Sequence, residues 1–500
     1  MPSIVLSTLN ARYIHSAFGL RYLKANLVDY EDDCDIIEFT IHERPIDIAE
    51  KLLLKKPKII GLGVYIWNIE ETTKIVSIIK QVSPETIIVI GGPEVSFEQQ
   101  NQLICQQADY VISGAGETSF SDLCNKLLNK KVIANKFIPQ QTPKLEDIRF
   151  PYHLYNDEDI AHRIIYVEAS RGCPFKCEFC LSALDKTAWP FDLDLFLEQL
   201  KSLYNRDVRH FKFVDRTFNL KIDNTIRILE FFLDRMDEKL FLHFELIPDH
   251  LPERLKQVIK KFPPHSLQFE IGVQSFNPQT QTLVSRRQDD EKTEQNLQWI
   301  RNETNAHIHA DLIIGLPGED INSFAAGLNR LTKLNPHEIQ IGILKRLRGS
   351  PIIRHSEKFE LRFNPTPPYN ILSNNLIDFA EMQRLSRFAR YWDMIINSGR
   401  FSNTKNIIFA GQPFQRFIVL SDWLFETTDQ THKISLKRLF ELLFDGLCNQ
   451  LACDENEASQ ALIQDFQSSG LKGSPSFQGK TINKKDQPKL KAANRQKRHA

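Results

Sequence analysis

The sequence predicts an α/β protein in which two parallel-sheet domains precede a mostly helical domain. Three observations support this fold class. Short β-branched runs alternate with helically spaced leucines and isoleucines over residues 1–130, and a second alternating series covers residues 161–350. Beyond Pro351 the alternation gives way to long helical patterns that run to about residue 470. Alternation of strand and helix is typical of βαβ units, in which helices cover a parallel sheet.

The first domain, residues 1–130, is expected to be a doubly wound sheet of the Rossmann or flavodoxin-like type. In such a sheet the ligand binds at the carboxyl ends of the strands. The expected strands are Ile4–Leu6, Ile36–Ile41, Lys58–Ile66, Thr86–Ile90 and Tyr110–Ile112.

Residues 131–160 have weak periodicity and are expected to be a linker. Six strands with intervening helices follow, which predicts a partial (β/α)6 TIM-like barrel over residues 161–350, with catalytic groups at the carboxyl ends of its strands. The expected strands are Ile164–Glu168, His210–Val214, Phe241–Leu246, Leu267–Gly272, His307–Ile314 and Glu338–Leu344.

Residues 351–470 form the expected helical domain, after a break at Pro365, Pro367 and Pro368. Residues 471–500 carry nine Lys or Arg against one Asp and are expected to be a disordered basic tail. Clustered cations can neutralise RNA phosphates, but the tail lacks alternating aromatic residues, so nucleic acid as a partner is unsupported.

The composition, the first ten residues and the length of the apolar runs indicate where the protein is located in the cell. The chain of 500 residues is 42% hydrophobic and 25% charged with a formal net charge of zero, which is ordinary for a globular protein. The start, Met1–Asn10, has no basic segment before its apolar residues and resembles a first strand rather than a signal peptide. No apolar run approaches the roughly 18 residues that a membrane span needs. We therefore expect a cytoplasmic protein with no membrane partner.

Three of the 8 cysteines, Cys173, Cys177 and Cys180, lie within one octapeptide directly after an expected strand. This crowding does not resemble a disulfide framework. Three thiolates suit a 4Fe–4S cluster in which one iron stays open to another ligand. The alternative is structural zinc, which wants a fourth Cys or His; Cys448 and Cys453 lie far along the chain.

The spacing Cys-x-x-x-Cys-x-x-Cys, with Phe179 before the last cysteine, resembles the radical S-adenosylmethionine (SAM) superfamily. The resemblance implies that the three cysteines bind the cluster and that SAM chelates the fourth iron. Electron transfer to the sulfonium then yields a 5′-deoxyadenosyl radical, and Phe179 would lie near the adenine. It also implies an external electron donor such as flavodoxin or ferredoxin.

Other segments resemble SAM-binding landmarks of that superfamily. Gln274 and Ser275 end a Gly-Val-Gln-Ser segment, and Arg286 follows where an arginine can bind the methionine carboxylate. A solvated helix arginine is the alternative for Arg286. Gly315 belongs to the strand and turn Asp311–Glu319, which resembles the signature near the adenine.

One departure concerns the second barrel strand, where many members carry Gly-Gly-Glu-Pro for the methionine amino group. This chain has Phe213–Asn219 instead. Asp215 could accept hydrogen bonds from the ammonium, or could merely cap the next helix. Glu245, at the end of the third barrel strand, is a second candidate with the same ambiguity.

The order of domains resembles the branch of the superfamily with an amino-terminal cobalamin-binding domain. The glycines that match the cobalamin pattern are Gly19, Gly61, Gly63, Gly91 and Gly92. His15 occupies the loop that can supply a cobalt ligand, but an aspartate is missing two residues before it and the spacing to Gly19 is one residue too long. The alternative is a scaffold domain that has lost its ligand.

The resemblance implies a cobalamin-dependent radical SAM enzyme that methylates an unactivated carbon of an unknown substrate. A second hypothesis keeps the radical step without methyl transfer, as in rearrangement or methylthiolation; the latter usually needs a second cluster, for which Cys34, Cys105 and Cys124 would have to meet. A third is a non-catalytic iron–sulfur or zinc protein. The helical domain resembles one attached to an uncharacterised subgroup.

Overall fold

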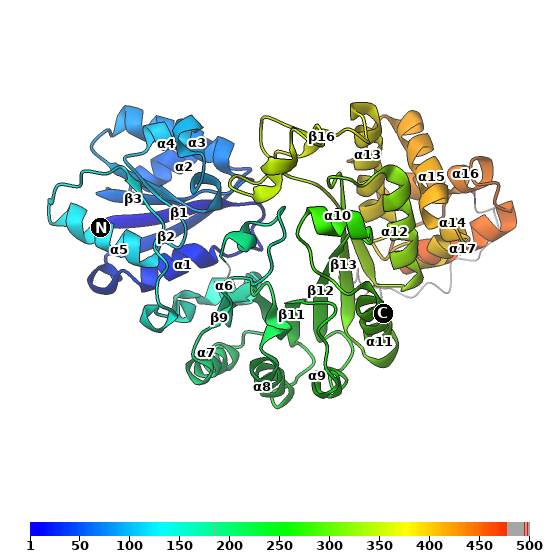
Figure 1. Cartoon of the computed structure of the whole chain (residues 1–500), viewed down its shortest axis with the longest axis horizontal. Helices are drawn as coiled ribbons and strands as arrows, with labels where there is room; N and C mark the ends of the chain where they lie inside the picture. Colours follow the sequence, from blue (N-terminus) through cyan, green and yellow to red (C-terminus); the bar gives the residue numbers. More distant parts are fainter. Residues whose placement is uncertain (186, 478–494, 496–497, 499–500) are drawn as a thin grey trace. The chain divides into compact units, whose positions relative to one another are not determined.

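The computed structural model describes residues 1–185, 187–477, 495 and 498 (Figure 1). The chain divides into two compact units. The first unit comprises Met1–Phe218, Lys345–Ile353 and Asn364–Asn370, and the second comprises Asn219–Leu344, Arg354–Phe363 and Ile371–Ala500. Most of the expected basic tail lies outside the described residues.

A six-stranded parallel sheet with the order β2-β1-β3-β4-β5-β6 is the core of the first unit. The sequence predicted five of these strands; the sixth, β6, lies in the expected linker and is too short to leave a periodic pattern. The strands are β1 (Ile4–Asn10), β2 (Cys34–Thr40), β3 (Ile59–Gly63), β4 (Ile87–Gly91), β5 (Tyr110–Ile112) and β6 (Phe137–Ile138).

Helices cover both faces of this sheet (Figure 1), which explains why the strands β3 and β4 carry no polar side chains. Two separate hydrophobic cores result, one that includes Ile48 and Ile75 and one that includes Leu20 and Phe120. The helices are α1 (Phe18–Ala25), α2 (Pro45–Leu53), α3 (Ile69–Val82), α4 (Leu103–Gln107) and α5 (Glu117–Leu128).

The rest of the first unit carries the cysteine loop. An antiparallel pair, β8 with β9, brackets this loop, with Arg171 opposite Trp189. Upstream, Asn156 forms a capping box at the start of α6. The elements are α6 (Asp157–His162), β7 (Ile165–Val167), β8 (Ser170–Arg171), β9 (Trp189–Pro190), α7 (Leu193–Asn205) and β10 (His210–Phe213).

The six strands expected for the partial barrel are present, with β7 beside β10 in the first unit and the order β14-β13-β12-β11 in the second unit. The four strands of the second unit pair in parallel, and the observed strand limits lie close to the predicted ones. They are β11 (Phe241–Leu246), β12 (Leu267–Gln274), β13 (His307–Ile314) and β14 (Glu338–Ile343). The helices between and beside them are α8 (Ile222–Leu233), α9 (Glu253–Ile259), α10 (Pro278–Leu283), α11 (Asp290–Glu303) and α12 (Ile321–Lys333).

A mostly helical region completes the second unit, as the sequence predicted. Its core is aromatic: Trp392 stacks on Phe409 with ring centroids 5.5 Å apart, and Phe388 packs edge-on against Phe417. Its elements are β15 (Arg362–Phe363), β16 (Ile371–Ser373), α13 (Phe379–Ile395), α14 (Ser402–Phe409), α15 (Pro413–Thr428), α16 (Leu436–Asn449) and α17 (Glu455–Ser468).

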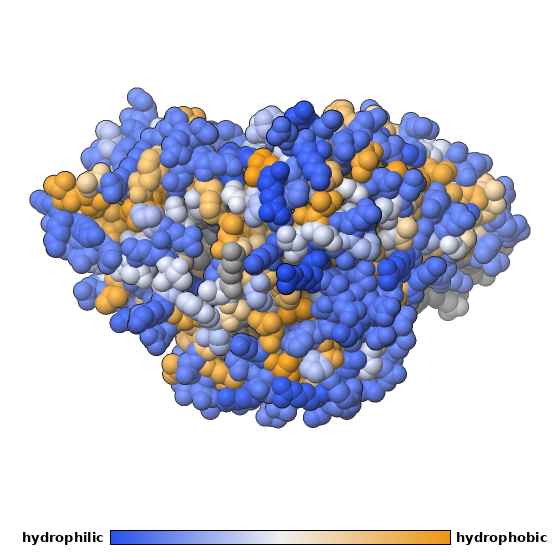
Figure 2. All heavy atoms as spheres, in the orientation of Figure 1, coloured by the Kyte–Doolittle hydropathy of each residue, from blue (hydrophilic) through white to orange (hydrophobic). Residues whose placement is uncertain are grey.

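The surface in view is dominated by hydrophilic side chains, with small scattered apolar groups (Figure 2). Within the described ranges, none of the helices combines the length and the apolar character needed to cross a bilayer.

Candidate active site

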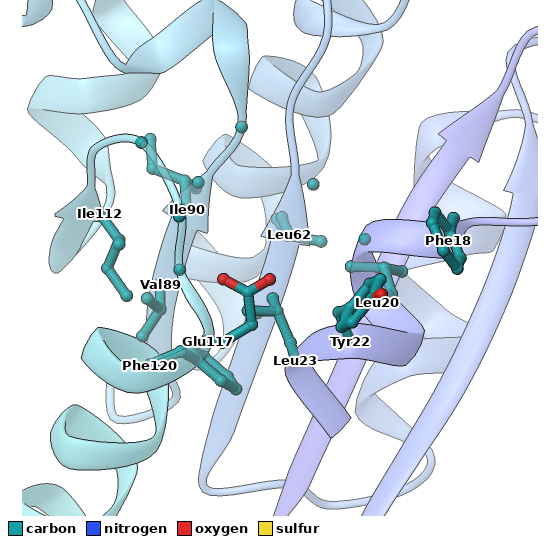
Figure 3. Close-up of a pocket in the computed structure, with 18 of the residues that line it drawn as sticks. Phe18, Leu20, Tyr22, Leu23, Leu62, Val89, Ile90, Ile112, Glu117 and Phe120 are labelled. Carbon is teal, nitrogen blue, oxygen red and sulfur yellow. The ribbon is translucent and has the colours of Figure 1, made fainter. Parts of the chain in front are cut away.

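A cavity of about 350 Å³ lies at the carboxyl ends of β3, β4 and β5 in the first unit (Figure 3). This is the edge at which doubly wound sheets bind their ligands. The parallel register sets Gly63 beside Thr8 on one neighbouring strand and Gly91 on the other. Glycines at these strand ends leave the space above the sheet open.

All five glycines predicted for cobalamin binding line this cavity, namely Gly19, Gly61, Gly63, Gly91 and Gly92. Two of them can hardly be replaced. A Cβ on Gly61 would lie 2.6 Å from Cδ2 of Leu6, and Gly92 has a φ of +113° with the carbonyl oxygen of Val64 2.5 Å from the Cβ position. The cavity therefore depends on glycine for close backbone packing as well as for open space.

His15 is not among the residues that line the cavity. Its Nδ1 lies 2.7 Å from the hydroxyl oxygen of Tyr166, and its backbone pairs with Ile164. Burial, followed by the charges of Lys212 and Arg12, lowers its pKa. These contacts give His15 a structural role in joining the loop after β1 to β7.

A group of three charged side chains, which we call the rim cluster, forms the polar part of the cavity wall: Glu117, Glu168 and Arg171. Arg171 donates to Glu117 over 2.7 Å and to Glu168 over 3.0 Å, and its guanidinium lies over the ring of Tyr22. Burial raises the pKa of Glu168 to about 7, although the charge of Arg171 acts in the opposite direction. Arg171 thus pairs with two carboxyl groups of low exposure beside the cavity.

Sequence reasoning missed the rim cluster. Glu117 follows Gly114 and Gly116 at the carboxyl end of a predicted strand, where ligands of such sheets are expected, and this position was the available signal. Its partner Arg171 is remote in the sequence and stands two residues before Cys173. The wall of the cavity is therefore continuous with the cysteine loop.

Within that loop, Cys173 is buried while Cys177 and Cys180 are partly exposed. The amide of Cys180 donates to the carbonyl of Cys177 over 3.0 Å, and that of Cys173 donates to the carbonyl of Asp185 over 3.1 Å. Burial raises the pKa of the Cys173 thiol, and the charges of Cys180 and Cys177 act in the same direction. The three thiols are thus close enough to influence one another.

Three soft thiol ligands fit the chemistry of an iron–sulfur cluster. Among the residues that the structure describes, no three His, Cys, Asp or Glu side chains are arranged to hold a single metal ion. A zinc ion would draw its ligands to within about 2.3 Å of one point, whereas a cluster spreads three cysteines over three irons. Three thiol donors match a cluster that leaves one iron open, whereas a structural zinc site needs a fourth Cys or His.

The hypothesis of a second cluster in the amino-terminal domain is wrong for this fold. Cys105 belongs to the hydrophobic core on one face of the first sheet, while Cys34 and Cys124 belong to the core on the other face. Burial raises the pKa of Cys34 to about 12 and that of Cys105 to about 11. The sheet separates Cys105 from Cys34 and Cys124, so the three thiols cannot share a cluster. Each packs within a hydrophobic core instead.

Two candidates for SAM contact lie in the first unit. Phe179 is half-buried beside Cys180. Asp215 is buried and accepts hydrogen bonds from the amide of Ala169, over 3.0 Å, and from the hydroxyl of Ser170, over 2.6 Å. Burial raises the pKa of Asp215 to about 6. Asp215 therefore holds the segment after β7 rather than capping α8, whose N-cap is Lys221.

The other candidates lie in the second unit, near the ends of its strands. Gln274 ends β12 with a φ of +70°, where the register with β13 shifts. Ser275 donates to Glu319 over 2.5 Å, so its hydroxyl is already engaged by a carboxylate that sequence reasoning passed over. Both residues stand at the carboxyl end of β12, the end at which barrel enzymes place catalytic groups.

Three further candidates complete this set. Arg286 donates to the carbonyl of Gly272 and to the side chain of Gln288, so it turns back on β12. Gly315 follows β13 with a φ of +90°, and a Cβ there would lie 2.7 Å from Ile371. Glu245 is half-buried near the end of β11.

Three family models match separate parts of the chain. The B12 binding domain matches residues 4–124, the Radical SAM superfamily matches residues 167–331, and a protein family of unknown function, DUF4080, matches residues 357–500. The first match contains the five glycines, and the second contains the three clustered cysteines.

Curated relatives match this chain at low identity. An uncharacterized methyltransferase of Pyrococcus horikoshii is 24% identical over 359 residues, which cover 66% of this chain and 76% of the relative. The cobalamin-dependent radical SAM methyltransferase TokK of Streptomyces tokunonensis is 22% identical, covering 58% of this chain and 47% of TokK. The chain thus matches about half the length of TokK.

Solved structures share the fold. The radical SAM methyltransferase TsrM of Kitasatospora setae aligns with a TM-score of 0.60 at 15% identity, over 75% of this chain and 80% of TsrM. The cobalamin-dependent SAM radical enzyme OxsB aligns with a TM-score of 0.62 at 15% identity, over 94% of this chain and 83% of OxsB.

The two matched domains determine the cofactors. A radical SAM domain implies SAM and a 4Fe–4S cluster, and a B12-binding domain implies cobalamin. The chain therefore carries a B12-binding domain ahead of a radical SAM domain, and this domain order is similar to that of the cobalamin-binding branch of the radical SAM superfamily.

Proposed function

We propose that this protein is a cobalamin-dependent radical SAM methyltransferase that methylates an unactivated carbon. One observation carries the proposal. The cavity of the B12-binding domain is closed by Glu168 and Arg171, which belong to the segment that leads into Cys173. A corrinoid held in this cavity and a cluster held by the cysteine loop would therefore share one stretch of the chain.

When bound, the cluster supplies the electron that cleaves SAM, and the corrinoid supplies a carrier for the methyl group. The chain's own residues bind and orient these groups. Cys173, Cys177 and Cys180 would hold the cluster, and the five glycines would make room for the corrinoid. Gln274 and Gly315, at strand ends of the second unit, and Arg286, between α10 and α11, are our candidates for contact with SAM.

The radical step needs a substrate and a reductant. We expect flavodoxin or ferredoxin to supply the electron, and a reducing cytoplasm to keep the three thiols free for iron. Relatives such as TokK and TsrM support methylation as the reaction class, in keeping with their names.

The test uses the full chain purified without oxygen, with iron and cobalamin supplied. The protein is reduced, incubated with SAM, and its products are followed by mass spectrometry. We expect 5′-deoxyadenosine from radical cleavage together with S-adenosylhomocysteine, the product left when SAM gives up its methyl group. Cys177→Ala should abolish 5′-deoxyadenosine.

The two reaction classes give different products in this assay. A radical enzyme that does not transfer methyl groups would form 5′-deoxyadenosine without S-adenosylhomocysteine, which would refute methylation and favour rearrangement. Absence of both products together with absence of iron would refute the radical function altogether.

A further inference from the structure

One oxygen of Glu117 lacks a hydrogen-bond partner within the part of the chain that the structure describes. Oε1 lies 2.7 Å from Nη1 of Arg171. Oε2 is buried, and the whole side chain is only 7% exposed. Figure 3 shows the carboxylate pointing into the cavity. Burying a carboxylate oxygen without a donor is costly, so this position favours a ligand that donates a hydrogen bond.

The surroundings of Glu117 are otherwise apolar. Aliphatic and aromatic side chains form most of the wall, including Leu20, Leu23, Leu62, Val89, Ile90, Ile112 and Phe120. A ligand that fits here needs a flat or apolar body and at least one O–H or N–H group. Such a combination is found in a nucleoside, which carries a hydrophobic base and ribose hydroxyls.

A buried carboxylate elsewhere in the same domain shows what a purely structural role looks like. Glu38, with 6% of its side chain exposed, also pairs with an arginine, Arg21, over 2.7 Å. Its second oxygen accepts hydrogen bonds from Asn10, over 2.6 Å, and from the amide of Ala17, over 2.7 Å. Glu38 does not line the cavity, and the protein satisfies both of its oxygens.

We propose that Glu117 accepts a hydrogen bond from the nucleotide tail of the corrinoid and thereby selects corrinoids that carry this tail. The proposal rests on the proposed function, because it takes cobalamin as the occupant of the cavity. A corrin ring with its amide arms is far too large for about 350 Å³, so only the nucleotide end of the cofactor can enter. The base would lie against the apolar wall, and a ribose hydroxyl would donate a hydrogen bond to Oε2 of Glu117.

The experiment compares hydroxocobalamin with aquocobinamide, which has the corrin ring but no nucleotide. Each is titrated against the full chain, and binding is measured by equilibrium dialysis. The test variant is Glu117→Gln, in which the amide oxygen can still accept from Arg171 while the amide nitrogen replaces the unsatisfied oxygen. The control is Glu38→Gln, matched in burial and in its arginine partner.

We expect Glu117→Gln to weaken cobalamin binding by about 10- to 100-fold, the effect of losing a hydrogen bond to a charged acceptor. Its affinity for cobinamide should stay within about twofold of the wild type, which also shows that the variant is folded. Glu38→Gln should change both affinities by the same factor.

An equal loss for both corrinoids in Glu117→Gln, or no loss for either, would overturn the role of Glu117. A wild-type protein that binds both corrinoids equally well would overturn it too, while leaving the proposed function intact. A wild-type protein that binds neither would refute the proposed function and this inference together.

Discussion

The ion pairs of the rim cluster predict how much stability the Arg171→Met substitution removes. The guanidinium pairs with Glu117 over 2.7 Å and with Glu168 over 3.0 Å, and the three side chains are 18%, 7% and 12% exposed. Methionine has a similar length but no charge, so it leaves two carboxylates buried without their cation. Removing one partner of a buried ion pair costs about 3–5 kcal/mol.

The size of the first unit determines how far this loss of stability lowers the melting temperature. A domain of 150–250 residues loses about 2–4 °C in Tm for each kcal/mol, so Arg171→Met should lower the transition of the first unit by about 6–20 °C. Differential scanning calorimetry of the anaerobic protein measures this shift. As a control, Arg254→Met breaks an exposed pair with Asp223, which should cost about 1 kcal/mol or less.

A double variant separates electrostatics from packing. Arg171→Met combined with Glu117→Gln removes one of the two stranded charges, so it should recover about 0.5–3 kcal/mol relative to the sum of the single effects. Strict additivity, or a single Arg171→Met variant that melts with the wild type, would refute the reasoning that Arg171 neutralises a buried pair.

Three further outcomes are expected. Burial raises the pKa of Glu319 from 4.5 to about 7, so the folded state binds the extra proton, and this contribution to stability is lost as pH rises through 7. In urea unfolding, the free energy of unfolding of Glu319→Gln should therefore rise relative to that of the wild type by up to about 3 kcal/mol between pH 4.5 and pH 8. A difference that stays constant with pH would contradict this. His15→Ala should leave cobalamin affinity and the bound absorption spectrum unchanged, because His15 contacts Tyr166 rather than the cavity; a spectral shift would restore it as a cobalt ligand. Cys105→Ala should leave the iron content per chain unaltered, and a loss of iron would revive a second cluster.

Much of the fold could be predicted because parallel strands leave a strong local signal. Buried β-branched runs located β3 and β5, and glycines at strand ends located the cavity. The strand β6 was missed because its two residues, Phe137 and Ile138, are too few to show the alternating pattern of a strand. Its pairing with β5 depends on tertiary contact rather than on local preference.

The polar contacts of the site were harder to predict because they join residues that are remote in the sequence. Arg171 reaches Glu117, and Ser275 reaches Glu319, only after different strands have paired. Burial then decides which oxygen is satisfied and which is not. At His15 the local sequence already departed from the cobalt-ligand motif, and in the fold the imidazole contacts Tyr166. A role for His15 toward cobalt stays a prediction.

Counting cobalt and iron per chain in two variants tests whether the cavity binds the corrinoid and the cysteine loop binds the cluster. Gly91 lines the cavity, and a Cβ there would make only ordinary contact, 3.5 Å from the carbonyl oxygen of Ile112, so Gly91→Leu should fold while its side chain fills the cavity. Cys177→Ala removes one of the three cysteines proposed to hold the cluster. We predict that Gly91→Leu keeps iron and loses cobalt, and that Cys177→Ala keeps cobalt and loses iron. Stoichiometric cobalt in Gly91→Leu would contradict the account, because the corrinoid would then be held somewhere other than this cavity.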